Sequence, residues 1–187
     1  MPVVNQVGNT LTGRTGTGTF VGANTPTLIT PVLGAATATS INFGGSTLST
    51  YTVATSFAPV FTFATPGDLS VVYSNQGGYY TRIGNFVHLQ FYISFTPTHT
   101  TASGESRISL PFACLAQNLA PPIGNIYTQS STFPAGTTSL ALQGVPGQSY
   151  MLVYSSGTGT AAANWSTTQY PTGVALLFAG SISYMTT

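Results

Sequence analysis

The amino-acid sequence predicts an all-β protein, an antiparallel β-sandwich of jelly-roll-like kind preceded by an extended N-terminal arm. Apolar and polar side chains alternate strictly over residues 86–95, which is typical of a strand with one buried face. Several shorter runs of the same kind follow at intervals punctuated by glycine, proline and asparagine. No stretch repeats apolar residues at helical spacing, and the alanine run at 161–163 is too short for a helix.

Residues 1–50 are predicted to form an attachment or oligomerisation arm, and residues 51–187 the β-sandwich domain. The arm is rich in glycine, threonine and proline, and it has no helical period. Proline favours extended backbone and removes hydrogen-bond donors, so we expect this segment to become ordered only against neighbouring chains. A flexible linker is the alternative. The side chains expected to make the contacts are Phe20, Pro26, Leu28, Ile29, Pro31 and Leu33.

The first strands of the domain are predicted between residues 56 and 95. An extended run that begins near residue 56 has Phe57, Phe61 and Phe63 on one face. Residues 69–83 are predicted to form a hairpin, because Asn-Gln-Gly-Gly at 75–78 is a turn signal between two alternating runs. The strand at 86–95 has an apolar face of Val87, Leu89, Phe91, Ile93 and Phe95, and a polar face of His88, Gln90, Tyr92 and Ser94.

Further short strands are predicted after a polar loop at residues 96–104. They lie near residues 107–110, 125–129, 139–143, 149–154 and 174–185. Gly180 falls inside the last of these runs, where an isolated glycine suggests a β-bulge. Many short strands separated by turns favour a sandwich over other all-β arrangements.

The chain carries very few charges. Three arginines and two carboxylates make up 3% of 187 residues, and the net charge is +1; an ordinary soluble domain is about 25% charged. Nucleic-acid binding needs clustered basic side chains, so no nucleic-acid partner is expected. No apolar run approaches the roughly 20 residues of a membrane-spanning helix, so no membrane insertion is expected. This composition suits a protein that buries much of its surface inside an assembly.

The charged residues are predicted to be structural. Asp68 follows a Pro-Gly pair and is expected to bond its own backbone in a turn. The Arg82 guanidinium is expected to stack on tyrosine and to brace the hairpin or a protomer interface, with a ligand contact as the alternative. Glu105 and Arg107 are predicted to pair on one side of a strand. Because Asp68 and Glu105 are the only carboxylates and lie in no catalytic motif, no catalytic residue and no enzymatic activity are expected.

The histidines and the cysteine predict neither a metal site nor a cofactor. His88 belongs to the polar face of its strand, and His99 is expected to be a solvated loop side chain. Three copies of His99 gathered on a threefold axis are the alternative. Cys114 is the single cysteine, which excludes an intrachain disulfide, and its apolar neighbours predict a small buried side chain.

Candidate ligand-binding residues lie around the single tryptophan. Trp165, Tyr170 and Asn164 occur in a polar stretch. Exposed aromatic rings beside amides are typical of carbohydrate binding, because the rings stack on sugar C–H faces and the amides bond hydroxyls. Two interpretations therefore stay open: Trp165 lies in the core or at an interface, or it belongs to a receptor-binding patch with Tyr170 and Asn164.

Several motifs resemble those of bacteriophage tail-fibre and other virion appendage proteins. They are Thr-Gly-Thr-Gly-Thr-Phe at 15–20 with the segment at 23–34, the stretches at 61–63 and 73–87, and Leu-Pro-Phe at 110–112. The resemblance covers most of residues 13–112, and Phe-Pro-Ala-Gly-Thr at 133–137 is the most familiar piece beyond it. Members of the family often carry tryptophan in the strand before Phe61, whereas the only tryptophan of this chain is Trp165.

The resemblance implies a virion structural protein, a homotrimeric fibre or appendage domain that mediates host attachment. Its expected partners are other copies of the chain, other virion proteins through the arm, and a host-surface glycan or protein. A capsid or tail decoration protein without receptor binding is one alternative. A free-standing lectin-like carbohydrate-binding module is another.

Overall fold

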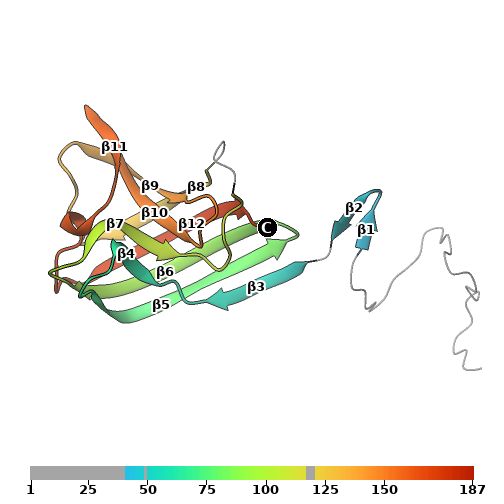
Figure 1. Cartoon of the computed structure of the whole chain (residues 1–187), viewed down its shortest axis with the longest axis horizontal. Coiled ribbons are helices and arrows are strands. Elements are labelled where there is room, and N and C mark those ends of the chain that lie inside the picture. The colour runs from blue at the N-terminus through green and yellow to red at the C-terminus, as the bar shows by residue number, and fades with distance from the viewer. Residues whose placement is uncertain (1–40, 49, 117–120) are drawn as a thin grey trace, which may run out of the picture. The chain divides into compact units, whose positions relative to one another are not determined.

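The computed structural model describes residues 41–48, 50–116 and 121–187 (Figure 1). The chain divides into two units, Met1–Ala38 and Thr39–Thr187, and the described residues all belong to the second. The predicted arm contacts from Phe20 to Leu33 lie outside the described residues. Within the segment expected to be an extended arm, β1 (Ile41–Phe43) and β2 (Ser46–Leu48) pair as an antiparallel hairpin.

The all-β prediction is confirmed. Ten further strands follow the hairpin, together with one short 3-10 helix, η1 (Thr167–Gln169), and the strands pair with antiparallel neighbours. Within the described ranges, no helix is long and apolar enough to cross a membrane. The strands are β3 (Tyr51–Phe57), β4 (Phe61–Thr65), β5 (Ser70–Ile83), β6 (Phe86–Thr98), β7 (Ser103–Ser109), β8 (Ile123–Gln129), β9 (Thr137–Gly144), β10 (Tyr150–Gly157), β11 (Thr160–Asn164) and β12 (Leu176–Met185).

One continuous sheet curls over on itself to make the two layers of the sandwich. Its strand order is β3-β5-β6-β12-β8-β9-β10-β7-β4, with β11 paired to β10. Figure 1 shows β3, β5, β6 and β12 side by side, with β4, β7 and β10 lying across them. The two edge strands, β3 and β4, are consecutive in the chain and are joined by residues 58–60. Near this closure the backbone N–H of Phe61 donates to the Tyr73 hydroxyl on β5, at 2.7 Å.

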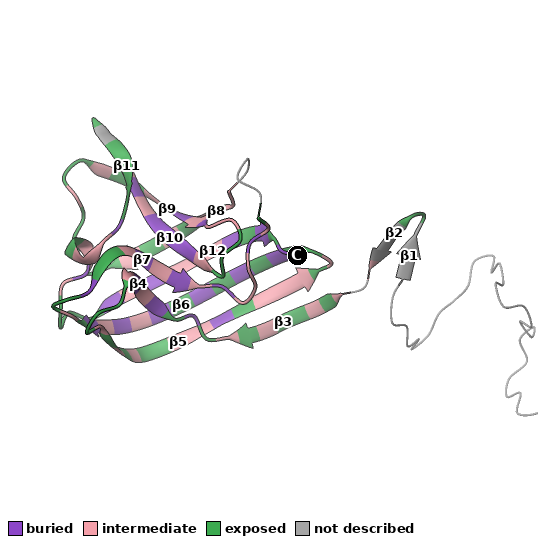
Figure 2. Ribbon diagram, viewed as in Figure 1, coloured by how far each residue is buried: buried purple, intermediate pink, exposed green. Residues whose placement is uncertain are grey.

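The core is a cluster of aromatic rings between the layers. The Phe61 ring of β4 lies 4.6 Å from that of Phe95 on β6, and the Phe95 ring lies 5.4 Å from that of Phe178 on β12. Figure 2 shows the buried residues as bands along β6 and β12, as strict alternation requires. Alternate residues of β6 are buried while His88, Gln90 and Tyr92 are exposed, so the predicted strand and its two faces are confirmed.

The predicted hairpin over residues 69–83 is wrong. Residues 70–83 form one continuous strand, β5, and the turn into β6 lies at Gly84, which has a φ of 57°. Of the two glycines at the predicted turn, Gly78 instead permits close packing within the sheet. A Cβ atom on Gly78 would lie 2.7 Å from the Phe57 ring and 2.9 Å from the Gln90 carbonyl oxygen. The extended run from residue 56 is likewise divided into β3 and β4 around Pro59.

The bulge expected at Gly180 is also wrong. The register of β12 against both β6 and β8 continues through Gly180 without a shift. A Cβ atom there would lie 2.6 Å from the Asn125 carbonyl oxygen, 3.0 Å from the Phe91 ring and 3.1 Å from a Leu142 methyl carbon. The glycine is required because neighbouring groups fill the space on the inner side of the sheet.

Candidate ligand-binding face

The outward-facing side of β5, β6, β12 and β8 presents two neighbouring rows of side chains. The cross-strand register places Gly77, Tyr92, Ala179 and Tyr127 in one row. It places Tyr79, Gln90, Ser181 and Asn125 in the next. We call the surface formed by these eight residues the tyrosine groove.

Three tyrosines stand out from this surface. Tyr79, Tyr92 and Tyr127 have 63%, 42% and 60% of their surface exposed. In the first row each tyrosine alternates with a residue that has little or no side chain, Gly77 or Ala179. The small residues leave open space between the rings. The rows therefore make a corrugated surface instead of a flat one.

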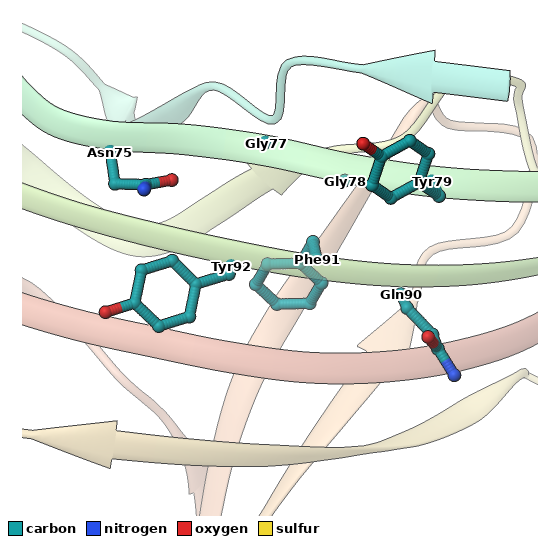
Figure 3. A pocket seen from close by; sticks show the side chains of 7 residues that line it. All are labelled: Asn75, Gly77, Gly78, Tyr79, Gln90, Phe91 and Tyr92. Atoms are coloured by element: carbon teal, nitrogen blue, oxygen red, sulfur yellow. The ribbon is translucent and has the colours of Figure 1, made fainter.

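The space between the rings forms adjoining shallow hollows. A hollow of about 470 Å³ lies over β5 and β6 and is bordered by Asn75, Tyr79 and Tyr92. A second hollow, of about 490 Å³, continues over β12 and β8 to Tyr127 and shares Gln90 and Phe91 with the first. Figure 3 shows how Asn75 and Tyr79 come from β5 while Gln90 and Tyr92 come from β6. Together the hollows run across four strands.

The tyrosine groove is suited to an uncharged ligand. None of its eight residues carries a charge; they offer aromatic rings, phenol hydroxyls and the side-chain amides of Gln90 and Asn125. Rings of this kind stack on C–H surfaces, and amides both donate and accept hydrogen bonds. A ligand with apolar faces and many hydroxyl groups matches these features.

The exposed patch expected around Trp165 is wrong in two of its three residues. Trp165 and Tyr170 are fully buried in the core, which is the alternative that the sequence left open for Trp165. The Trp165 ring contacts that of Phe178 across the core, and the Tyr170 hydroxyl donates to the Ser106 hydroxyl oxygen at 2.6 Å. Burial raises the pKa of Tyr170. Only Asn164, at the end of β11, is exposed.

Arg82 braces the chain in the way its structural interpretation predicts, although its ring partner is different. Its Nε donates to the Gly84 carbonyl oxygen at 2.8 Å, and a terminal nitrogen donates to the Thr187 carbonyl oxygen at 3.2 Å. The guanidinium carbon lies 4.8 Å from the centre of the Phe112 ring. Arg82 thus stacks on a phenylalanine instead of a tyrosine and fastens the turn between β5 and β6.

Asp68 fastens a different segment from the one expected. Its carboxylate accepts backbone N–H bonds from Thr100 at 2.9 Å and Thr101 at 2.8 Å, and it also accepts bonds from both threonine hydroxyls. These bonds, led by that from the Thr100 hydroxyl, hold the pKa of Asp68 well below its usual range. The carboxylate therefore joins the β4–β5 turn to the β6–β7 loop, instead of bonding its own backbone.

The other carboxylate is also engaged. Glu105 accepts from Arg107 at 2.5 Å, as the sequence predicts, and this bond lowers the pKa of Glu105. The Arg107 guanidinium carbon lies 4.4 Å from the centre of the Tyr150 ring. Neither carboxylate lines the tyrosine groove.

The histidines and the cysteine have separate partners. His99 donates from Nε2 to the Tyr170 carbonyl oxygen at 3.0 Å and contacts the Phe63 ring, so it is partly buried instead of a solvated loop residue. His88 shares a hydrogen bond with Ser183 at 2.9 Å. Cys114 is buried as predicted, and burial raises the pKa of its thiol to about 11. Over the described part of the chain, no three His, Cys, Asp or Glu side chains gather as a metal site.

The residues of the tyrosine groove were not among the predicted ligand contacts. The polar alternation of β6 marks Gln90 and Tyr92 as outward-facing, and that signal is visible in the sequence. Tyr127 joins them only because β8 lies beside β12, a neighbour relation that no local pattern encodes.

Comparison with known proteins finds a likeness of fold. No protein-family model matches the chain, and no curated protein matches it. The fold is similar to that of the Dettilon tailspike protein (gp208), with a TM-score of 0.54 and 17% sequence identity. The alignment covers 71% of this chain and 23% of the tailspike chain, so this chain corresponds to less than a quarter of that protein.

Proposed function

We propose that the chain is a structural protein of a bacteriophage virion, a homotrimeric fibre or appendage domain that attaches the particle to its host through an uncharged surface glycan. The observation that carries the proposal is the tyrosine groove, an uncharged row of rings and amides on the exposed face of a rigid sheet. The likeness of fold to a tailspike protein and the motifs at residues 15–34 and 73–87 support a virion appendage.

Binding of this kind relies on shape and on many weak contacts. Sugar rings present C–H faces that stack on tyrosine, and their hydroxyls match the amides of Gln90 and Asn125. A single groove is shallow, so its affinity is expected to be low. Several copies on one particle raise the overall affinity through multivalency, which suits attachment to a repetitive surface polymer. The N-terminal segment supplies the link to the particle.

A glycan array probed with the full chain tests the proposal, with neutral and acidic bacterial polysaccharides compared side by side. We expect binding to neutral glycans that falls at least about tenfold in the double variant Tyr79→Ala, Tyr92→Ala, because each stacked ring contributes on the order of 1 kcal/mol. Val72→Ala is the matched control, since Val72 is exposed on the same strand but lies outside the groove. Tyr92→Phe separates loss of the ring from loss of the hydroxyl.

Absence of binding to any glycan or to host cells would contradict the attachment role and favour a decoration protein without a receptor. Binding that survives in the double variant would show that the ligand lies elsewhere. Deletion of residues 1–50 distinguishes the lectin-like alternative from an appendage protein. A free-standing lectin-like module needs only its binding domain, so it would keep its whole function without these residues. An appendage protein would keep glycan binding but lose incorporation into the particle.

A further inference from the structure

Four large apolar side chains form a separate row at one end of the outward-facing side. Tyr51 pairs with Ile83, Ile83 with Phe86, and Phe86 with Met185 across β3, β5, β6 and β12. Their exposed fractions are 63%, 48%, 44% and 48%. We call these four residues the apolar row.

The apolar row is distinct from the tyrosine groove. The intervening row contains Thr81, His88 and Ser183, and the last two are hydrogen-bonded to each other. Phe86 and Gln90 are four residues apart on β6, which corresponds to about 14 Å along a strand. The surface between the tyrosine groove and the apolar row is polar. The two are therefore separate surfaces.

Nothing within the described residues covers the row. The nearest charged side chain in sequence is Arg82. Its guanidinium lies over the Phe112 ring and bonds Gly84, so its aliphatic part does not cover the apolar row. The chain has no lysine whose stem could shield apolar surface. Single exposed apolar side chains are common on soluble proteins, whereas four neighbouring ones in one row are a feature of interaction surfaces.

We propose that the apolar row packs against a second copy of this chain, and so forms a protomer contact of the oligomer; this inference rests on the proposed function. The row has no charge, so two copies can approach without like-charge repulsion, and a charged partner gains no attraction. Tyr51 is the first residue of β3, directly after the segment that links the domain to the particle. Copies tethered through that segment are held at high effective concentration, with this row at the tethered end of each domain.

Cross-linking tests the contact without depending on a destabilising change. The variant Phe86→Cys is made in the full chain with Cys114→Ala, so that the introduced thiol is the only one present. Mild oxidation is expected to give covalent dimers at low protein concentration. Val72→Cys in the same background is the control, since it is exposed on the outward-facing side but away from the row. Equal cross-linking of the two variants, or none in either, would overturn the proposal.

Light scattering on Phe86→Glu gives an independent measurement. A carboxylate in the row of each copy repels its counterpart, so we expect at least a tenfold higher concentration to be needed for assembly, while Val72→Glu behaves as the wild type. Circular dichroism confirms that both variants are folded. An unchanged mass for Phe86→Glu would mean that the row is covered by another virion protein or by the N-terminal segment, and would contradict the proposal.

The outcome can be separated from that of the glycan experiment. A Phe86→Glu chain that fails to assemble but still binds glycan supports both proposals, because the groove lies on each single chain. A wild-type chain that cross-links through Phe86 but binds no glycan or cell keeps the protomer contact and contradicts attachment. A wild type that stays monomeric at all concentrations overturns the protomer contact whatever the array shows.

Discussion

Each charged side chain that the structure describes is used for a contact inside its own chain. Asp68 holds the loop at Thr100 and Thr101, and Arg82 lies over an aromatic ring and bonds the backbone. Glu105 and Arg107 pair with each other. Charge therefore serves local architecture at the scale of single residues, and the outward-facing side of β5, β6, β12 and β8 is left to uncharged side chains.

Asp68→Asn is expected to lower the melting temperature at pH 7, because an amide cannot accept all the bonds that the carboxylate receives from Thr100 and Thr101. The pKa of Asp68 is depressed in the folded chain. The stabilisation is therefore present above the unfolded value of about 4 and is lost as the pH falls towards the folded pKa. Thermal melts at a series of pH values should show the difference between wild type and variant shrinking below about pH 4. A constant difference down to pH 2 would contradict the assignment.

Gly180→Ala is expected to destabilise the fold by about 1–3 kcal/mol, because the added methyl meets the Asn125 carbonyl oxygen and the Phe91 ring. Gly77→Ala is the matched control, since no atom lies within 4 Å of a Cβ built on Gly77. Urea denaturation of both variants measures the difference in the free energy of unfolding. Equal effects would show that the inner side of β12 can relax around a methyl group.

The sequence shows where such glycines lie, but it does not show which structural role each of them has. A glycine in a Gly-Gly pair and one inside a strand suggested a turn and a bulge, and both Gly78 and Gly180 instead allow a neighbouring group to approach closely. Those neighbours come from other strands. Local sequence patterns do not identify these neighbours. Both glycines were therefore recognised as structurally special, but the role assigned to each was wrong.

Strands were predictable where one face is buried and the other exposed. β6 matches the expectation closely because its alternation directly records burial. β5 was divided in two because residues 75–78 are turn formers in isolation, whereas their pairing with β6 keeps them extended. An exposed Trp165 was one interpretation because its neighbours in sequence are polar. In the structure its ring packs against Phe178 and Tyr170, and its backbone carbonyl oxygen accepts from the Ser106 N–H on β7.

A partly buried hydroxyl, that of Tyr73, joins β5 to the start of β4. Tyr73→Phe leaves the backbone N–H of Phe61 without its acceptor, which is expected to cost about 1–3 kcal/mol in the free energy of unfolding. Tyr79→Phe on the same strand is the control, and its exposed hydroxyl should contribute less than about 0.5 kcal/mol. Chemical denaturation of the two variants compares them, and similar losses would mean that water replaces the Tyr73 hydroxyl.

At the scale of the whole molecule, the sequence predicts the fold class but not the path of the sheet. The prediction of a two-layer antiparallel structure follows from the number and spacing of the strands. Their order does not, because β12 inserts between β6 and β8 from the far end of the chain. The tyrosine groove and the apolar row both depend on that insertion, since the groove includes Ala179 and Ser181 of β12 and the row includes Met185. For this reason neither surface could be found by sequence analysis.

Assembly should be almost independent of ionic strength. The chain has a net charge of +1 and few charges to screen, so raising the salt concentration from 50 mM to 1 M removes little attraction or repulsion between copies. Light scattering at both salt concentrations is expected to give the same mass, close to three times the 19.3 kDa of one chain. Dissociation in high salt would show that an ionic contact holds the copies together.

The position of β3 also has a mechanical consequence. It is an edge strand, it begins at Tyr51, and its partner in the sheet is β5. Hydrogen bonds between antiparallel strands lie perpendicular to the strand axis. In the proposed attachment role, a force on the N-terminal end of the domain enters at Tyr51 along β3 and shears these bonds together instead of breaking them one by one. The resistance of the domain to this force then depends on the β3–β5 pair, and the register shift between Thr52 and Thr55 is where that pair has the fewest bonds to share the force.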